Sequence, residues 1–283
     1  MELLIDADIV AYRAAASAEN EEEGIALARM HDIMHGILSS LQHTGYRCYL
    51  SGGGNFRKVL YPEYKANRVQ PKPKWLHKCR EHLVISYNAV IVDGIEADDA
   101  IGMNMGPETV CVSIDKDLRQ LPGWHYNFVK GQLDEVNEYD AEYNFYAQFL
   151  IGDRSDNIFG VQGIGEKKAE KILYGMDVGD MFSKVRELYN NDARFLLNGQ
   201  LLHVFRKKDD IWLPQSLEYL WFGTDPSKVV EAAKYEYWQQ ILEESTQSPV
   251  PMKQQTETGF PVDGQCMEGL LESTSPLPTS SAA

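Results

Sequence analysis

Short apolar runs alternate with segments of helical periodicity over the first 115 residues. In the segment 24–42, apolar residues recur every three or four positions, which predicts a helix with one buried face. Runs of strand length, which predict β-strands, stand at the start of "ELLIDADIVAY" and at 46–50, 88–94 and 108–114. Strands that alternate with helices indicate a mostly parallel sheet covered on both faces.

From about Phe145 the pattern becomes helical. A polar break with Asp153 and Asp156 is followed by a hairpin rich in glycine and by a helix rich in lysine. Such glycines let a backbone approach a ligand, and a helix start favours an anion. An ordinary helix–turn–helix with glycine caps explains the pattern equally well. Helices are expected to about Glu244, and the Ser-, Thr- and Pro-rich tail 245–283 is expected to be disordered.

Composition adds one contrast to this picture. The chain has a net charge of −15, yet Arg57–Arg80 holds eight basic residues and one acid. Such a concentration of cations is a candidate phosphate-binding surface. Four isolated cysteines, no basic leader and no apolar run long enough to span a bilayer predict a protein of the reducing cytoplasm without a membrane segment.

Acidic residues follow the predicted strands. Asp6 and Asp8 lie late in the first strand, on one face by their spacing. The other acids come just beyond the third and fourth strands: Glu96, Asp98, Asp99, Asp115 and Asp117. Because ligand sites of parallel sheets lie at the carboxyl ends of strands, these acids are expected to meet at one edge. The alternative is a set of solvated acids, such as those that begin many helices.

Five segments occur in the order and spacing of a known family. They are "LLIDAD", "FRKVLYPEYKANR", "EADDAIG", "SIDKDLRQL" and "LIGDRSDNIFGVQGIGEKKAEKIL". This ordered set resembles the 5′-nuclease (flap endonuclease) family, which includes phage 5′–3′ exonucleases and the 5′-nuclease domain of bacterial DNA polymerase I. The resemblance covers about residues 2–175, and the lean chain looks most like the phage members.

The resemblance implies an α/β fold with a PIN-like, mostly parallel sheet flanked by helices. A helical arch over the active site and a helix–three-turn–helix motif that grips the duplex belong to the same fold. We therefore expect a nuclease core at 1–150, with the arch at about 56–84. The duplex-gripping motif and C-terminal helices are expected at 151–244, and the tail at 245–283.

The resemblance also implies roles for single residues. Metal-binding carboxylates would be Asp6, Glu96, Asp98, Asp99, Asp115, Asp117, Asp153 and Asp156. Lys65 and Arg68 would act on the scissile phosphate, and Tyr64 would stack on a nucleobase. Hairpin contacts to the duplex would come from Gly160, Gly163, Gly165, Lys167 and Lys168. Oxygen ligands suit two Mg²⁺ ions, with Mn²⁺ as a substitute, and this family can also hold K⁺ on carbonyls of the hairpin.

One position departs from the family pattern. Members usually have an aspartate at the end of the second strand, shortly before the "FR" that opens the arch. The stretch here reads "YLSGGGNFRK", and the matching position is taken to be Gly52. Asp8 is a candidate to replace the missing carboxylate, because it is expected on the same face as Asp6.

The leading function is a metal-dependent 5′–3′ exonuclease or 5′-flap endonuclease acting on DNA ends, flaps and junctions, with RNA primers or RNA–DNA hybrids as further substrates. A monomer without a membrane partner is expected. The rival is a structure-specific DNA-binding protein whose catalysis is impaired by the missing aspartate. A PIN-type ribonuclease is the third alternative, which the long basic arch and the duplex-gripping hairpin disfavour.

Overall fold

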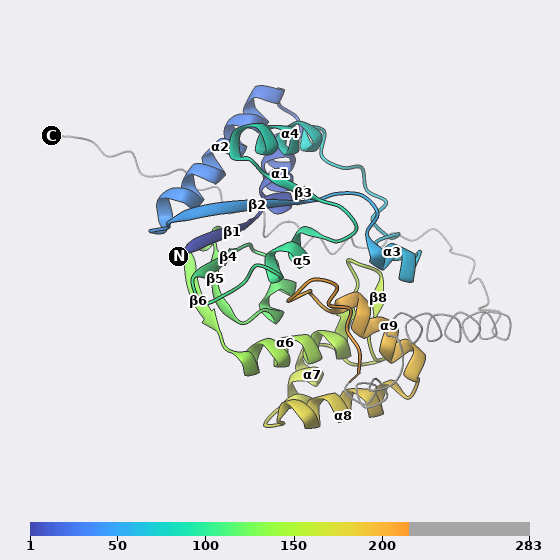
Figure 1. Cartoon of the computed structure of the whole chain (residues 1–283). Coiled ribbons are helices and arrows are strands. Elements are labelled where there is room, and N and C mark those ends of the chain that lie inside the picture. The colour runs from blue at the N-terminus through green and yellow to red at the C-terminus, as the bar shows by residue number, and fades with distance from the viewer. Residues whose placement is uncertain (215–283) are drawn as a thin grey trace, which may run out of the picture.

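A six-stranded sheet forms the centre of the chain in this computed structural model, which describes residues 1–214 (Figure 1). The strand order is β3-β2-β1-β4-β5-β6, and only β6 runs antiparallel to its neighbour. The strands are β1 (Glu2–Asp6), β2 (Gly45–Ser51), β3 (Val90–Val92), β4 (Thr109–Val112), β5 (Gly123–Asn127) and β6 (Gln132–Val136). The predicted mostly parallel α/β sheet is confirmed. The helices expected beyond residue 214 and the tail lie outside the described residues.

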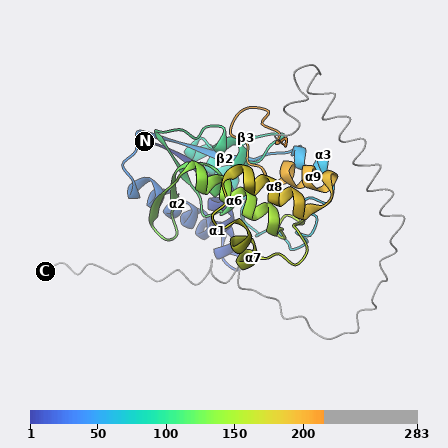
Figure 2. The same cartoon turned by 90° about the horizontal axis from the view of Figure 1, so that it is seen from below.

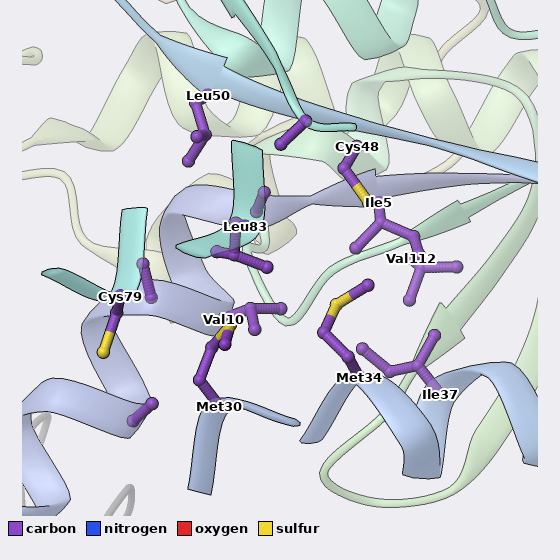
Figure 3. Packing of buried hydrophobic residues seen from close by; sticks show 14 of the residues in the cluster. Ile5, Val10, Met30, Met34, Ile37, Cys48, Leu50, Cys79, Leu83 and Val112 are labelled. Carbon is purple, nitrogen blue, oxygen red and sulfur yellow. The ribbon is translucent and has the colours of Figure 1, made fainter. Parts of the chain in front are cut away.

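Three helices cover one face of the sheet: α1 (Ala7–Ser17), α2 (Glu23–Ser40) and α4 (Leu76–Tyr87). Met30, Met34 and Ile37 of the stripe predicted in α2 are buried against strand residues. Figure 3 shows this packing, with Met34 and Ile37 beside Ile5 and Val112. The buried face that the helical periodicity of 24–42 predicted is therefore confirmed, and it buries apolar surface against the sheet.

The opposite face carries α5 (Ala97–Gly102) and, further along the chain, a helical layer. This layer contains α6 (Glu138–Ile151), α7 (Glu166–Leu173), α8 (Val178–Tyr189) and α9 (Asp192–Leu202). It has its own aromatic core, in which the rings of Phe149 and Phe195 stack 4.9 Å apart. Figure 2, seen from below, shows α6 and α8 in front of the sheet. No helix within residues 1–214 combines the length and the apolar character that crossing a membrane requires.

Three features of residues 1–138 differ from the prediction. The first strand ends at Asp6, whose side chain accepts a hydrogen bond from the backbone N–H of Ile9 and so begins α1. Asp8 consequently lies in the first turn of a helix, and the shared strand face predicted for Asp6 and Asp8 is wrong. The β5–β6 hairpin was not predicted, and α6 begins at Glu138, seven residues before the expected Phe145.

The segment predicted as a helical arch is helical only at its ends. It begins with the short helix α3 (Phe56–Leu60) and ends in α4. Between them, residues 61–75 form turns and irregular backbone. Cys79 and Leu83 of α4 are buried in the core beside α1 and α2, so α4 belongs to the covering layer of the sheet.

A small hairpin, β7 (Gly152–Asp153) with β8 (Ile158–Phe159), connects α6 to the glycine-rich segment. Gly152 and Gly160 face each other so closely that side chains do not fit. A Cβ atom added to Gly160 would lie 2.3 Å from the carbonyl carbon of Ile151 and 2.4 Å from the backbone nitrogen of Gly152. Gly160 is therefore required by packing inside the protein.

We expect Gly160→Ala to destabilise the fold by about 2 kcal/mol or more, because its methyl group meets backbone atoms that cannot rotate away. Gly36→Ala in α2 is the matched control, since a Cβ there meets nothing within 4 Å. Alanine at this helical position should raise the free energy of unfolding by up to about 1 kcal/mol. Urea unfolding measures both changes, and equal stabilities of the two variants would contradict the packing argument.

Candidate active site

Acidic side chains from three strand ends meet at the carboxyl edge of the sheet. Asp6 ends β1, and its Oδ2 accepts a hydrogen bond from the hydroxyl of Ser113, which follows β4 (2.8 Å). The same hydroxyl accepts from the backbone N–H of Asp115 (3.0 Å), and Asp115 in turn accepts from the N–H of Asp117 (2.9 Å). This chain of bonds fixes the aspartates of "SIDKD" beside Asp6.

Helix α5 brings the acids of "EADD" to the same place. Glu96 is its N-cap, and Asp98 lies in the first turn, where negative charge is favoured by the helix dipole. The Asp99 side chain accepts from the backbone N–H of Glu96 (3.0 Å), which completes a capping box. The capping box thus orients Glu96, and the first turn of α5 brings Asp98 next to it.

The loop between β7 and β8 contributes Asp153 and Asp156, both buried. Asp153 accepts bonds from the backbone N–H and the hydroxyl of Ser155, each 2.7 Å long. The Tyr64 hydroxyl lies 2.8 Å from carboxylate oxygens of both Glu96 and Asp156. Tyr64 therefore connects the acids of α5 with those of the β7–β8 loop.

The carboxylates raise one another's pKa values where no cation lies between them. Burial raises the pKa of Asp6 to about 7, and the charge of Asp115 adds to this effect. Burial and the neighbouring aspartates also raise the pKa values of Asp98, Asp115 and Asp117. Together with Glu96, Asp153 and Asp156, these four aspartates form what we call the acid cluster, which carries more negative charge than its surroundings balance.

Lys65 and Arg68 supply part of the missing positive charge. The Lys65 ammonium pairs with Glu96 and lies 3.4 Å from Asp156, and Arg68 pairs with Asp156. Burial opposes ionisation of Glu96, but the charge of Lys65 outweighs it and lowers the pKa of Glu96. The two predicted catalytic cations are therefore at the acid cluster, where they pair with carboxylates.

Asp99 has a different partner from the one expected. Its carboxylate forms a bidentate ion pair with Arg57, with N–O distances of 2.6 and 2.8 Å, and both side chains are buried. It also accepts from the backbone N–H of Phe205 (3.1 Å). Burial would raise the pKa of Asp99, yet the guanidinium holds it below the ordinary value. Because its oxygens are occupied, we do not retain Asp99 among the proposed metal ligands.

Most cations of the basic segment form internal ion pairs. Five of the eight pair with carboxylates: Arg57, Lys65, Arg68, Lys78 and Arg80. Tyr64 is only 2% exposed, so the stacking on a nucleobase that we expected is not available to it in this conformation. The phosphate-binding surface across Arg57–Arg80 stays a prediction, in which these five cations would have to exchange their carboxylate partners for phosphate.

The structure at the end of β2 changes the position that we matched to the missing aspartate, which was Gly52. A Cβ at Gly52 would lie 2.2 Å from an Asp93 oxygen and 2.7 Å from the Val92 carbonyl, so an aspartate does not fit there. The side chain that reaches α5 is Ser51, whose hydroxyl accepts from the Ala97 N–H (2.9 Å). The strand therefore presents a hydroxyl to the acid-bearing helix.

Asp8 does not replace that carboxylate. Its side chain accepts from the backbone N–H of Ser51 (2.7 Å) and pairs with Arg80 of α4. These bonds attach α1 and α4 to the end of β2. The expectation that Asp8 joins Asp6 in binding metal is not supported, because Asp8 is held by Arg80.

The glycine-rich segment 160–165 leads into α7. Gly163 has φ +76°, and a Cβ atom added to Gly163 or Gly165 would meet nothing within 4 Å, so no other segment covers either residue on that side. The exposed lysines Lys167 and Lys168 follow at the start of α7. The Lys168 ammonium donates to the Gly163 carbonyl (3.2 Å), which engages one of the carbonyls expected to hold K⁺.

The acid cluster fits a divalent cation by its chemistry. One carboxylate oxygen of Asp117 is buried and has no hydrogen-bond partner, and the surrounding donors are oxygens, which hard cations prefer. Within residues 1–214, no three His, Cys, Asp or Glu side chains are placed to hold a metal ion as they stand. Lys65 occupies contacts to Glu96 and Asp156 that a metal ion would compete for.

Sequence reasoning missed three residues that organise this site. Ser113 and Ser51 carry hydroxyls without a motif of their own, and only the strand ends reveal their position. Arg57 was predicted as a surface cation, although its position next to Phe56 was a signal. Its guanidinium lies 4.6 Å from the centre of that ring, as cations beside aromatic faces do.

A model of the 5′-3′ exonuclease N-terminal resolvase-like domain matches residues 1–148. A 5′-3′ exonuclease of Buchnera aphidicola is 30% identical over 224 residues, covering 67% of this chain and 73% of that protein. DNA polymerase I of Caldicellulosiruptor bescii is 36% identical over 166 residues, 49% of this chain but only 19% of the polymerase. The chain thus spans about a fifth of the polymerase it matches.

Solved structures of low sequence identity share the fold. The phage T5 D15 flap endonuclease, in a complex with DNA and metal ions, has a TM-score of 0.58 at 17% identity, covering 86% of this chain and 98% of that one. T5 5′-exonuclease with bound zinc gives the same values. The family model and the relative from Buchnera aphidicola show that the chain belongs to the 5′-3′ exonuclease family.

The raised pKa of Asp6 predicts a pH-dependent stability. Its value is 3.8 ordinarily and about 7 in the fold, so between these values the folded protein keeps a proton that the unfolded chain has released. The free energy of unfolding should therefore fall as the pH rises from about 4 to 7. Asp6→Asn should flatten this fall.

Urea unfolding at pH 5 and pH 8 in EDTA measures the effect. Asp134→Asn on β6 is the control and should keep the wild-type pH dependence. A slope in Asp6→Asn as steep as in the wild type would show that Asp6 releases its proton normally.

Because the Arg57–Asp99 pair is buried, removing Arg57 should cost far more stability than removing the arginine of an exposed ion pair. Arg57→Met leaves the Asp99 carboxylate buried without a countercharge and should cost about 3–5 kcal/mol of stability. Arg119→Met removes the partner of Asp134 in a pair that is 33–40% exposed and should cost less than about 1 kcal/mol. Thermal or urea unfolding compares the two variants, and similar losses would refute the assigned role of Arg57.

Proposed function

We propose that this protein is a metal-dependent 5′–3′ nuclease that hydrolyses phosphodiester bonds in DNA at 5′ ends, flaps and junctions. The single observation that carries the proposal is the convergence of acids from three strand ends and the β7–β8 loop on one edge of the sheet, with Lys65 against them. A cluster so rich in mutually repelling carboxylates is poorly suited to bind phosphate unless cations come with it.

Seven of the predicted carboxylates remain as proposed ligands for two divalent cations: Asp6, Glu96, Asp98, Asp115, Asp117, Asp153 and Asp156. All offer oxygen donors, which suit Mg²⁺ or Mn²⁺. When bound, such ions supply charge stabilisation to both the attacking and the leaving oxygen of a phosphoryl displacement. The protein's own part is to hold these carboxylates at fixed positions through Ser113, Ser155 and the capping box of α5.

Lys65 and Arg68 would bind the scissile phosphate. Both now pair with carboxylates of the acid cluster, so metal ions that neutralise Glu96 and Asp156 would leave the two cations available for phosphate oxygens. Lys65 has φ +58°, and its backbone N–H donates to the Asp156 carbonyl (2.9 Å). This bond fixes the position from which the ammonium reaches the phosphate, as charge stabilisation in a preorganised site requires.

The glycine-rich segment 160–165 and the start of α7 would bind duplex DNA without recognising its base sequence. Gly163 and Gly165 leave their backbone open, and Lys167 and Lys168 present charge at the start of α7. Amides at a helix start and nearby lysines are common phosphate contacts. Packing inside the protein already explains why residue 160 is a glycine, so we assign Gly160 no direct contact with DNA.

The rival hypothesis of an impaired DNA-binding protein has one observation in its favour. The end of β2 presents the Ser51 hydroxyl to α5 in place of a carboxylate. Loss of one anionic ligand weakens binding of a hard cation, but seven acids remain. We therefore favour an active nuclease and treat the inactive binder as the outcome that the next experiment separates from it.

A 5′-flap duplex incubated with the purified protein should be cut in Mg²⁺ and remain intact in EDTA. Asp117→Asn should reduce the rate about 10²-fold or more at saturating DNA, because it removes an anionic ligand. Binding of the flap should be unchanged or tighter, since one charge that repels phosphate is lost.

Asp134→Asn changes an acid of β6 that pairs with Arg119, and it should cut at the wild-type rate. A wild-type protein that binds the flap and cuts nothing at any Mg²⁺ or Mn²⁺ concentration would establish the binding protein instead. Full activity in Asp117→Asn would remove Asp117 from the ligand set.

A further inference from the structure

Phe159 differs in exposure from the other phenylalanines of residues 1–214. Its side chain is 62% exposed, whereas every other phenylalanine in residues 1–214 is buried or half-buried. A single exposed apolar residue needs no explanation by itself. Two features distinguish Phe159: its backbone is held by hydrogen bonds and packing, and it lies beside the proposed DNA site.

The backbone of Phe159 is held firmly. Its carbonyl accepts hydrogen bonds from Arg194 and Asn198 of α9, each 2.8 Å long. The next residue, Gly160, packs against the backbone at 150–152 without room for a side chain. The ring is therefore presented to solvent from a backbone that is fixed on both sides.

Nothing across the small hairpin covers the ring. Ile158 is buried in the helical core, and because successive side chains of a strand point to opposite faces, Phe159 points away from that core. Its cross-strand partner in β7 is Gly152, which has no side chain. One face of the aromatic ring is thus left accessible.

Phe159 also lies between the two parts of the proposed DNA site. Asp156 of the acid cluster precedes it by three residues, and the open glycines Gly163 and Gly165 follow. Three residues of chain span at most about 10 Å, and the nucleotides of one DNA strand are spaced about 3.4 Å apart. Under the proposed function, the backbone of Phe159 therefore lies within about three nucleotide spacings of the acid cluster.

We propose that Phe159 stacks on a nucleobase of the bound DNA, within about three nucleotides of the cleaved bond. This inference rests on the proposed nuclease function and adds to it a contact with a base. An aromatic ring on a fixed backbone stacks on any base, because every base has a π-face. The contact therefore contributes affinity without sequence preference, beside the phosphate contacts of the hairpin.

Fluorescence anisotropy of a labelled 5′-flap duplex in Mg²⁺ tests this contact, with every protein compared carrying Asp117→Asn to slow cleavage. Phe159→Ala should raise the Kd about 5- to 150-fold, the range that corresponds to loss of one stacked base. Phe159→Tyr keeps the π-face and should bind within about twofold of the wild type. Phe159→Leu keeps apolar bulk without that face and should resemble Phe159→Ala. Ile85→Ala, at a residue of α4 that is 67% exposed, is the control and should not change the Kd.

Two further readouts separate stacking from other roles. The salt dependence of binding should keep its slope in Phe159→Ala, because no phosphate contact is lost. Replacing Lys167, Lys168 and Lys171 together should flatten that slope. 2-Aminopurine placed within three nucleotides of the junction should be quenched by the wild type and not by Phe159→Ala.

Each outcome has a distinct meaning. If Phe159→Ala binds the flap like the wild type, the stacking proposal is wrong while the nuclease function stands. If Phe159→Ala lowers the unfolding temperature and Phe159→Leu restores both stability and binding, the ring only packs over Gly152, and the proposal also fails. If the wild type neither binds nor cuts the flap, the proposed function fails and the stacking proposal fails with it.

Discussion

The buried ion pair of Arg57 and Asp99 is the interaction on which the arrangement of the site depends. The guanidinium donates to Asp99, to the Leu201 carbonyl (2.9 Å) and to the His203 carbonyl (2.6 Å). It thereby joins the start of the basic segment, the acid-bearing helix α5 and the end of α9. A buried carboxylate without this partner would be costly, so the position of Asp99, and of the helix start it caps, follows from Arg57.

The acid cluster differs from this ion pair, because nearby cations balance only part of its negative charge. Asp99 and Glu96 have cations beside them and lowered pKa values, whereas Asp6 and Asp117 have none in contact and raised ones. Asp99 thus holds the fold through Arg57, whereas Glu96, Asp6 and Asp117 are proposed ligands for cations from solution. Sites that bind hard cations need such crowded oxygens, and crowding is stable only when the fold enforces it through bonds such as that of Ser113 to Asp6.

The negative net charge of the protein is compatible with binding DNA, because what matters is which cations are available to phosphate. Five cations of the basic segment pair with carboxylates of the chain. Under the proposed function, metal ions that neutralise Glu96 and Asp156 would release Lys65 and Arg68 to phosphate, and Lys167 and Lys168 at the start of α7 would add to that charge. The firm backbone around Phe159 and Gly160 connects these two places, because Arg194 of α9 donates to both carbonyls. The acids and the hairpin are therefore parts of one rigid frame.

The sequence by itself determined the α/β class, the buried stripe of α2, the hairpin before α7 and the convergence of acids, because periodicity and strand order are local and topological properties. It did not reveal the β5–β6 hairpin or the true end of β1, where Asp6 caps a helix, since these depend on hydrogen bonds rather than on apolar pattern. Only the tertiary structure decided which charges pair: Arg57 with Asp99, Arg80 with Asp8. It also placed Ser51, rather than Gly52, next to α5. Charge pairing and packing between distant segments depend on distances in space, which spacing along a chain does not contain.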